Sequence, residues 1–209
     1  MISAAAFAVV SLLNAAPGKA DVRAEKPNPP AYVTGVVTSS FPMIPLIENQ
    51  KMPYQSGDMA PVDLDLTRQS ATTDDGFYLQ ISVPMASMGQ ASVMKNVKAE
   101  DQAAALQTAY SELLKMLSER AARSVNGKIT ERKALNLPFG RGVALSGPVF
   151  EDGVPSAIGQ FLVHAVITDA PDIQVILGTS RNDKLSQDKM QEFVRSLNFA
   201  PSTAAKLNR

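Results

Sequence analysis

Two long β-forming runs are the feature of this sequence that most restricts its fold. Residues 158–168 and 173–179 are rich in Val, Ile, Leu and Phe, and the turn-forming stretch DAPD separates them. This pattern predicts a β-hairpin. A lone hairpin is only marginally stable in water, so its apolar side chains need further strands or a helix against them. The rest of the chain must therefore supply the other parts of a sheet-containing core.

Four more segments have the character of strands. In the first two of them, apolar and polar residues alternate, which is typical of a strand with one wet face. The other two lie between turn-forming stretches such as LPFGRG. These four segments are 62–66, 77–83, 128–135 and 142–146.

Two segments have helical periodicity. Between residues 100 and 123 the apolar side chains follow one stripe, and Asn126 and Gly127, which tolerate positive φ, mark its end. Residues 186–199 repeat the helical spacing behind Ser186, a residue type that can cap a helix. The order of elements predicts an α+β fold, in which a long inserted helix and a C-terminal helix cover an antiparallel meander sheet.

The first twenty residues have features of a secretory signal. No charge occurs from Ala4 to Leu13, and this run is shorter than the roughly 20 residues that span a bilayer. Gly18-Lys19-Ala20 places small residues where a cleavage site needs them, so the mature chain is expected to begin at Asp21. A buried amino-terminal helix is the alternative, although residues 4–13 lack a polar face. We expect export to a periplasm, or to a lumenal or extracellular equivalent.

Composition restricts the chemistry that this chain can perform. Cysteine is absent, so we expect no disulfide, no thiol nucleophile and no lipid-anchored cysteine. Twenty Lys and Arg balance twenty Asp and Glu, and a dedicated nucleic-acid-binding protein is expected to have a basic surplus. We therefore expect neither a nucleic-acid partner nor, after residue 20, a membrane-spanning segment.

A proline-rich region separates the signal from the sheet and helices. Seven of the fourteen prolines lie between residues 21 and 75, which predicts an extended arm or linker before an α+β domain over 76–200 and a tail over 201–209. The arm also has too many apolar side chains for a solvated tether, so it should either cover the protein's own domain or dock on a partner. The candidate partner-binding residues are Phe41, Met43, Ile44, Leu46, Ile47, Met52 and Tyr54.

No group of residues has the pattern of a catalytic or metal site. His164 is the single histidine, and a hydrogen-bonded structural role suits it better than catalysis, which needs a placed partner. Asp63 and Asp65 share one strand face and are interpreted as solvated.

Two other patterns could be taken for sites. Gly140-Arg141-Gly142 lacks the glycine spacing of a phosphate-binding loop and is interpreted as a turn. Met85, Met88 and Met94 could bind Cu(I) through sulfur, but methionine also fills irregular apolar gaps. We expect no enzymatic activity, no cofactor and no metal.

The order of elements resembles that of a known family. The stretch FGRGVALSG, the strand FLVHAVIT beside IQVILGT, and the terminal FVRSLNF resemble the PsbP-like and DcrB-like domain family over about residues 76–200. The resemblance implies a small exported accessory or binding domain, often attached to membrane complexes, rather than an enzyme. Some members of the family are lipoproteins, and this chain departs from them because it has no cysteine to acylate.

Two functions are compatible with these observations. The first is an exported, non-catalytic accessory or binding subunit that associates with a membrane or envelope protein complex through its N-terminal arm. The alternative is a self-contained carrier of a small apolar or metal ligand. The position of the apolar side chains of residues 41–54 distinguishes the two, because a docking arm needs them to be exposed.

Overall fold

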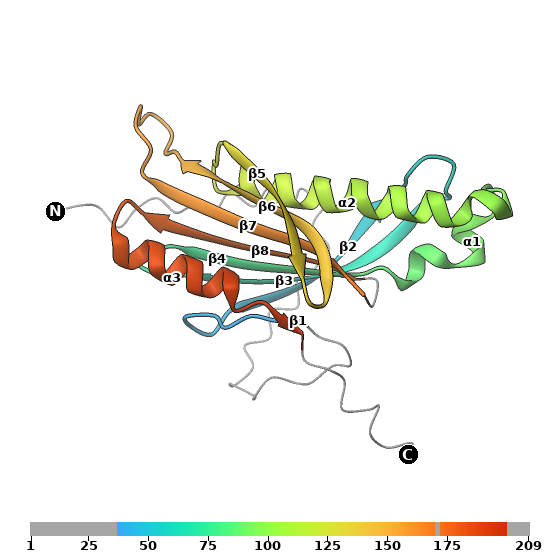
Figure 1. The fold of residues 1–209 in the computed structure, drawn as a ribbon, viewed down its shortest axis with the longest axis horizontal. Coiled ribbons are helices and arrows are strands. Elements are labelled where there is room, and N and C mark those ends of the chain that lie inside the picture. The colour runs from blue at the N-terminus through green and yellow to red at the C-terminus, as the bar shows by residue number, and fades with distance from the viewer. Residues whose placement is uncertain (1–36, 170–171, 200–209) are drawn as a thin grey trace, which may run out of the picture.

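A seven-stranded antiparallel sheet with a helix on each face forms the body of the protein (Figure 1). The computed structural model describes residues 37–169 and 172–199. This arrangement confirms the predicted α+β fold and its antiparallel meander sheet. In spatial order the strands are β2 (Leu46–Tyr54), β3 (Val62–Thr72), β4 (Phe77–Pro84), β8 (Asp172–Arg181), β7 (Gly159–Thr168), β6 (Gly140–Val149) and β5 (Glu131–Leu137).

The helical segments lie between β4 and β5 and after β8. The connection from β4 to β5 contains two short 3-10 turns, η1 (Ala86–Gly89) and η2 (Ala99–Asp101), a short helix α1 (Ala91–Met94), and the long helix α2 (Gln102–Ser124). Asn126 follows α2 with φ of 52°, which confirms the predicted end of this helix. Helix α3 (Lys184–Arg195) follows β8, and a two-residue strand β9 (Asn198–Phe199) then pairs with β1 (Val37–Thr38).

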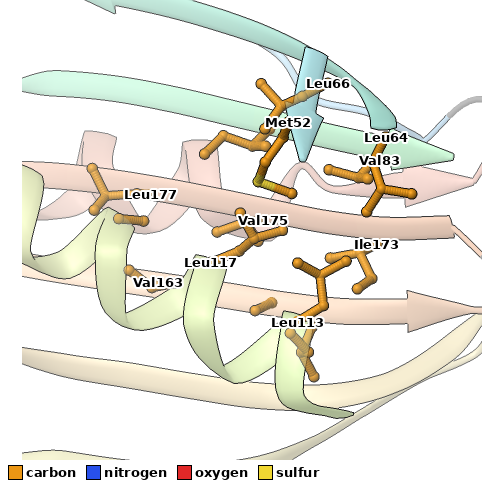
Figure 2. Close-up of a cluster of buried hydrophobic side chains, with 14 of the residues drawn as sticks. Met52, Leu64, Leu66, Val83, Leu113, Leu117, Val163, Ile173, Val175 and Leu177 are labelled. Atoms are coloured by element: carbon orange, nitrogen blue, oxygen red, sulfur yellow. The ribbon is translucent and has the colours of Figure 1, made fainter. Parts of the chain in front are cut away.

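The larger core lies between the sheet and α2. Leu113 and Leu117 of α2 are buried against β7 and β8, and Figure 2 shows Leu117 next to Val175 and Leu113 next to Ile173. Three methionines from the region of η1 and α1 also belong to this core, and flexible methionine side chains fill irregular apolar space well. Those side chains are Met85, Met88 and Met94.

Helix α3 covers the opposite face of the sheet. Phe193 and Val194 pack there on Tyr78, Val166 and Ile176, all of which are buried. The ring of Phe193 meets that of Tyr78 edge-on at 5.1 Å between centroids. An ion pair between Lys189 of α3 and Asp75 also joins this helix to the turn between β3 and β4.

Strand β8 explains the strong hairpin pattern of the sequence. Its side chains alternate between the two cores, with Val175 and Leu177 facing α2 and Ile176 facing α3. All residues from 173 to 180 are buried. A strand covered on both faces is apolar almost throughout, which is what the sequence shows between Ile173 and Leu177.

The structure corrects the expected boundary at residues 75 and 76. Strands β2 and β3 belong to the same sheet as β4, so residues 46–75 are part of the domain rather than of an arm. Proline in this stretch misled the prediction. Pro53 lies in β2, which is an edge strand, and edge strands tolerate a residue without an amide hydrogen.

Two local predictions were also wrong. Asp183, not Ser186, caps α3, because its Oδ1 accepts a hydrogen bond from the Ser186 backbone amide at 2.9 Å. Gly140 and Gly142 are in strand β6 rather than in a turn. The signal at residues 1–20, the Asp21 terminus, the first part of the arm and the tail at 201–209 all lie outside the described residues.

Candidate protein-binding surface

Exposed apolar side chains are concentrated at the start of β2. Five large apolar side chains are exposed in the described part of the chain, and four of them fall within residues 43–47. Their exposed fractions are 50% for Met43, 70% for Ile44, 58% for Leu46 and 59% for Ile47. We call these four residues, together with Pro45 between them, the 43–47 segment. Contiguous apolar exposure of this kind marks interaction surfaces more often than isolated exposed residues do.

Contacts upstream hold the segment against the α3 side of the sheet. The ring of Phe41 packs on that of Phe193, with centroids 4.9 Å apart. The Ser40 backbone amide donates a hydrogen bond to Ser196 Oγ at 2.8 Å, and Ser39 Oγ donates to Gln80 Oε1 at 2.5 Å. The residues just before the segment are therefore fixed to the domain.

Strand pairing holds the segment from the downstream side. β2 pairs with β3 from Leu46 onwards, where Leu46 lies opposite Ser70. Farther along β2, Met52 is buried in the larger core, and the Tyr54 hydroxyl donates to the backbone oxygen of Ala109 in α2 at 2.9 Å. Burial raises the pKa of Tyr54. The 43–47 segment is thus presented between two anchored ends.

The seven predicted partner-binding residues therefore separate into two groups. Phe41, Met52 and Tyr54 pack on the protein's own domain, where a partner cannot reach most of their surface. Met43, Ile44, Leu46 and Ile47 remain exposed. The first group covers the protein's own domain, which was one interpretation of this region. The exposure of the second group is consistent with the other interpretation, docking on a partner.

The surface next to the segment has few unbalanced charges. Glu48 follows it directly and pairs with Arg68 of β3, with Nη1 and Oε2 2.9 Å apart. Lys51 is exposed farther along β2. An apolar patch whose neighbouring carboxylate is already paired is suited to protein contacts, because association there buries few unpaired charges.

The other candidate residues have structural positions. Asp63 and Asp65 are exposed, which confirms their assignment to a solvated face. Met85 and Met88 are fully buried among apolar side chains, as filler of the core would be. Among residues 37–169 and 172–199, no three His, Cys, Asp or Glu side chains lie close enough together to hold a metal ion.

His164 lies on the α3 side of β7, between Ala144 of β6 and Ile176 of β8. Burial there, with Arg195 nearby, lowers the pKa of His164 to about 4. The imidazole is therefore uncharged at neutral pH. The hydrogen bond expected for this residue is not found within the part of the chain that the structure describes.

Buried apolar side chains occupy the region between the sheet and α2. Figure 2 shows some of them, which come from β2, β3, β4, α2, β7 and β8. A shallow open depression lies instead on the outer surface of α3, lined by Asp188, Gln191, Glu192, Arg195 and Ser196. Its lining comes from one helix and has no buried polar group to orient a ligand.

Comparisons of the chain with protein-family models, with curated proteins and with solved structures gave no match. None of the described helices combines the length and the apolar character that crossing a membrane requires.

Proposed function

We propose that the protein is an exported, non-catalytic accessory subunit, and that it binds a protein of a membrane or envelope complex through the 43–47 segment. The observation that carries this proposal is the exposure of four neighbouring apolar side chains on a chain whose flanking residues are anchored. Because the backbone on both sides is already fixed, binding there would cost less conformational entropy than ordering a free tether.

Two features of the sequence support the cellular setting. The apolar run from Ala4 to Leu13, followed by Gly18-Lys19-Ala20, favours export. The resemblance to the PsbP-like and DcrB-like family favours an accessory role beside a membrane complex.

Affinity purification from the native host tests the proposal. The wild-type chain is compared with a variant that carries Met43→Asp and Ile44→Asp, and with the matched control Leu185→Asp. Leu185 is 62% exposed and lies on α3, so its replacement adds a carboxylate to an apolar position at another site. We expect the partner protein with the wild type and the control, and its loss with the double variant, because two carboxylates would have to be buried in the interface.

The folded state is checked on the same samples. Exposed substitutions usually change the free energy of unfolding by no more than about 0.5 kcal/mol. A partner that the double variant retains in full contradicts the proposal. Unfolding of the double variant also contradicts it, because residues 43 and 44 would then be a cover for the protein's own core.

A further inference from the structure

The outer edge of β2 is a second feature with the character of an interface. β2 lies at one end of the seven-stranded sheet, and within the described residues no strand pairs with its outer side. An unpaired edge presents backbone N–H and C=O groups that can pair with another strand. In most proteins charged side chains, proline or bulges protect such an edge.

The two edges of this sheet differ in that protection. β5, at the other end, begins with Glu131, Arg132 and Lys133. Arg132 pairs with Glu119 at 2.8 Å, and Lys133 pairs with Glu131 at 2.7 Å. β2 begins instead with Leu46 and Ile47, both more than half exposed, and its charged residues Glu48 and Lys51 and its Pro53 come only after them.

Leu46 and Ile47 point to opposite faces of the sheet. Successive side chains alternate along a strand, so Leu46 shares the α2 face with Met52, and Ile47 lies on the α3 face opposite Gln69. A partner lying flat on one face of the sheet would cover one of these side chains and leave the other exposed. A strand added beside β2 would flank both of them.

We propose that β2 of a second copy of this chain is that added strand, antiparallel to the first across a twofold axis through Asn49. The two β2 strands would join the sheets of both copies into one. A symmetric contact of this kind closes on itself and gives a dimer. The formal net charge of the chain is zero, so no net repulsion opposes the approach of a second copy.

The sequence of β2 suits this register. In an antiparallel pair, residues that lie opposite each other point to the same face of the sheet. In the dimer, each residue must therefore lie opposite one that points to the same face, and this holds only if the twofold axis passes through a residue rather than between two residues. With the axis at Asn49, Leu46 lies beside Met52 of the second copy, Ile47 lies beside the stem of its Lys51, and Glu48 lies beside its Gln50.

Neighbouring registers are less favourable. An axis at Glu48 would place two Glu48 side chains opposite each other, and an axis at Lys51 would do the same with two lysines. An axis at Gln50 would bring Pro53, which has no amide hydrogen, into the new ladder. The Asn49 register avoids all three problems and uses residues 46–52 of each copy.

This dimer shares Leu46 and Ile47 with the 43–47 segment of the proposed function. Met43 and Ile44 precede the paired residues, so they stay outside the ladder and remain available to another protein. A contact of one strand pair is small, and interfaces of that size give weak association.

Two measurements on the full chain test the dimer. Sedimentation velocity over about 1 to 200 micromolar, the range in which a weak complex forms, should show a concentration-dependent dimer for the wild type and for Leu185→Asp. Ile47→Lys should shift the chain to monomer, because its ammonium group would lie opposite Lys51 of the second copy, and like charges directly opposite each other destabilise a strand pair. A monomer at every concentration, or a dimer that Ile47→Lys leaves unchanged, overturns the proposal.

Single cysteines then test the register, since the chain has none of its own. With Asn49→Cys, the two sulfurs would meet at the axis, where opposite Cβ atoms lie about 4.5 to 5.5 Å apart, and mild oxidation should join the copies. With Lys51→Cys, the two sulfurs would lie four residues apart along the ladder, about 13 Å, so cross-linking should be at least tenfold slower. Equal rates at the two positions overturn the Asn49 register.

Discussion

The rings of Phe41 and Phe193 lie 4.9 Å apart, and this contact joins the beginning of the described chain to its last helix. Phe41 packs on the domain two residues before Met43, where the exposed apolar side chains begin. The exposed segment therefore begins at a fixed position. Its presentation depends on α3 as well as on β2.

Replacing Phe193 with alanine should destabilise the domain by about 3 to 5 kcal/mol, the usual range for removing a buried phenylalanine. Its ring contacts both Phe41 and Tyr78, so the variant would loosen α3 and the residues that precede the 43–47 segment. Denaturant unfolding measures the loss. Leu185→Ala on the same helix is the control, and equal stabilities for the two variants would contradict the assigned packing of α3.

Acidification from pH 6.5 to pH 4 should destabilise the fold through His164. The folded protein lowers the pKa of His164 to about 4, whereas an unfolded histidine has its ordinary value of about 6.5. Within that window the unfolded chain binds a proton that the folded chain does not, so stability falls as pH falls. His164→Gln should show a shallower pH dependence of the unfolding free energy than the wild type. Parallel curves would show that His164 is solvated in the fold.

Tyr78→Phe should leave the stability unchanged or raise it by up to about 1 kcal/mol. The buried Tyr78 hydroxyl lies near Thr73 but makes no hydrogen bond of good geometry within the described residues, and a poorly satisfied buried hydroxyl is costly. Tyr54→Phe is the matched control, because the Tyr54 hydroxyl bonds to Ala109 and its loss should cost about 0.5 to 1.5 kcal/mol. Thermal unfolding of both variants measures the contrast, and a larger loss at position 78 than at 54 would contradict it.

Gly142→Ala should destabilise the β6–β7 pairing by about 1 to 3 kcal/mol. A Cβ at this position would overlap the backbone oxygen of Ala165 on the neighbouring strand. Gly89→Ala is the control, since a Cβ there meets no atom within 4 Å and should raise stability by about 0.4 to 1 kcal/mol. The same unfolding midpoint for the two variants would contradict the close approach of Gly142 to the backbone of Ala165.

The central part of the fold could be predicted from the sequence because its elements are covered on defined faces. The hairpin of β7 and β8 and the stripe of α2 bury many apolar side chains at regular spacing, and such periodicity is visible in the residues themselves. The end of α2 was also predictable, because Asn126 takes a conformation that few residue types accept.

The first two strands were harder to predict. The high proline content predicts a linker here, but β2 is an edge strand whose outer side can accept Pro53, so this stretch still joins the sheet. Its alternation is also weak, because apolar and polar residues occur on both of its faces. A rule based on proline alone could not distinguish this edge strand from a linker.

The candidate surface was predicted in part. Apolar content identified residues 41–54 but could not distinguish the buried residues from the exposed ones, because burial depends on which side chains face the sheet and α2. Met52 lies opposite Leu64 and enters the core, whereas Leu46 lies opposite Ser70 at the open end of the same strand. This difference depends on strand register, which the sequence does not specify for an edge strand.

Site-specific photo-cross-linking in the native cell tests the proposed binding surface most directly. A photoreactive side chain at position 44 is compared with the same side chain at position 185. Leu185 has a similar exposed fraction, 62% against 70% for Ile44, but lies on α3. We expect a cross-linked product with one other protein at position 44 and none of that product at position 185. The same product at both positions, or no product at position 44, would contradict it.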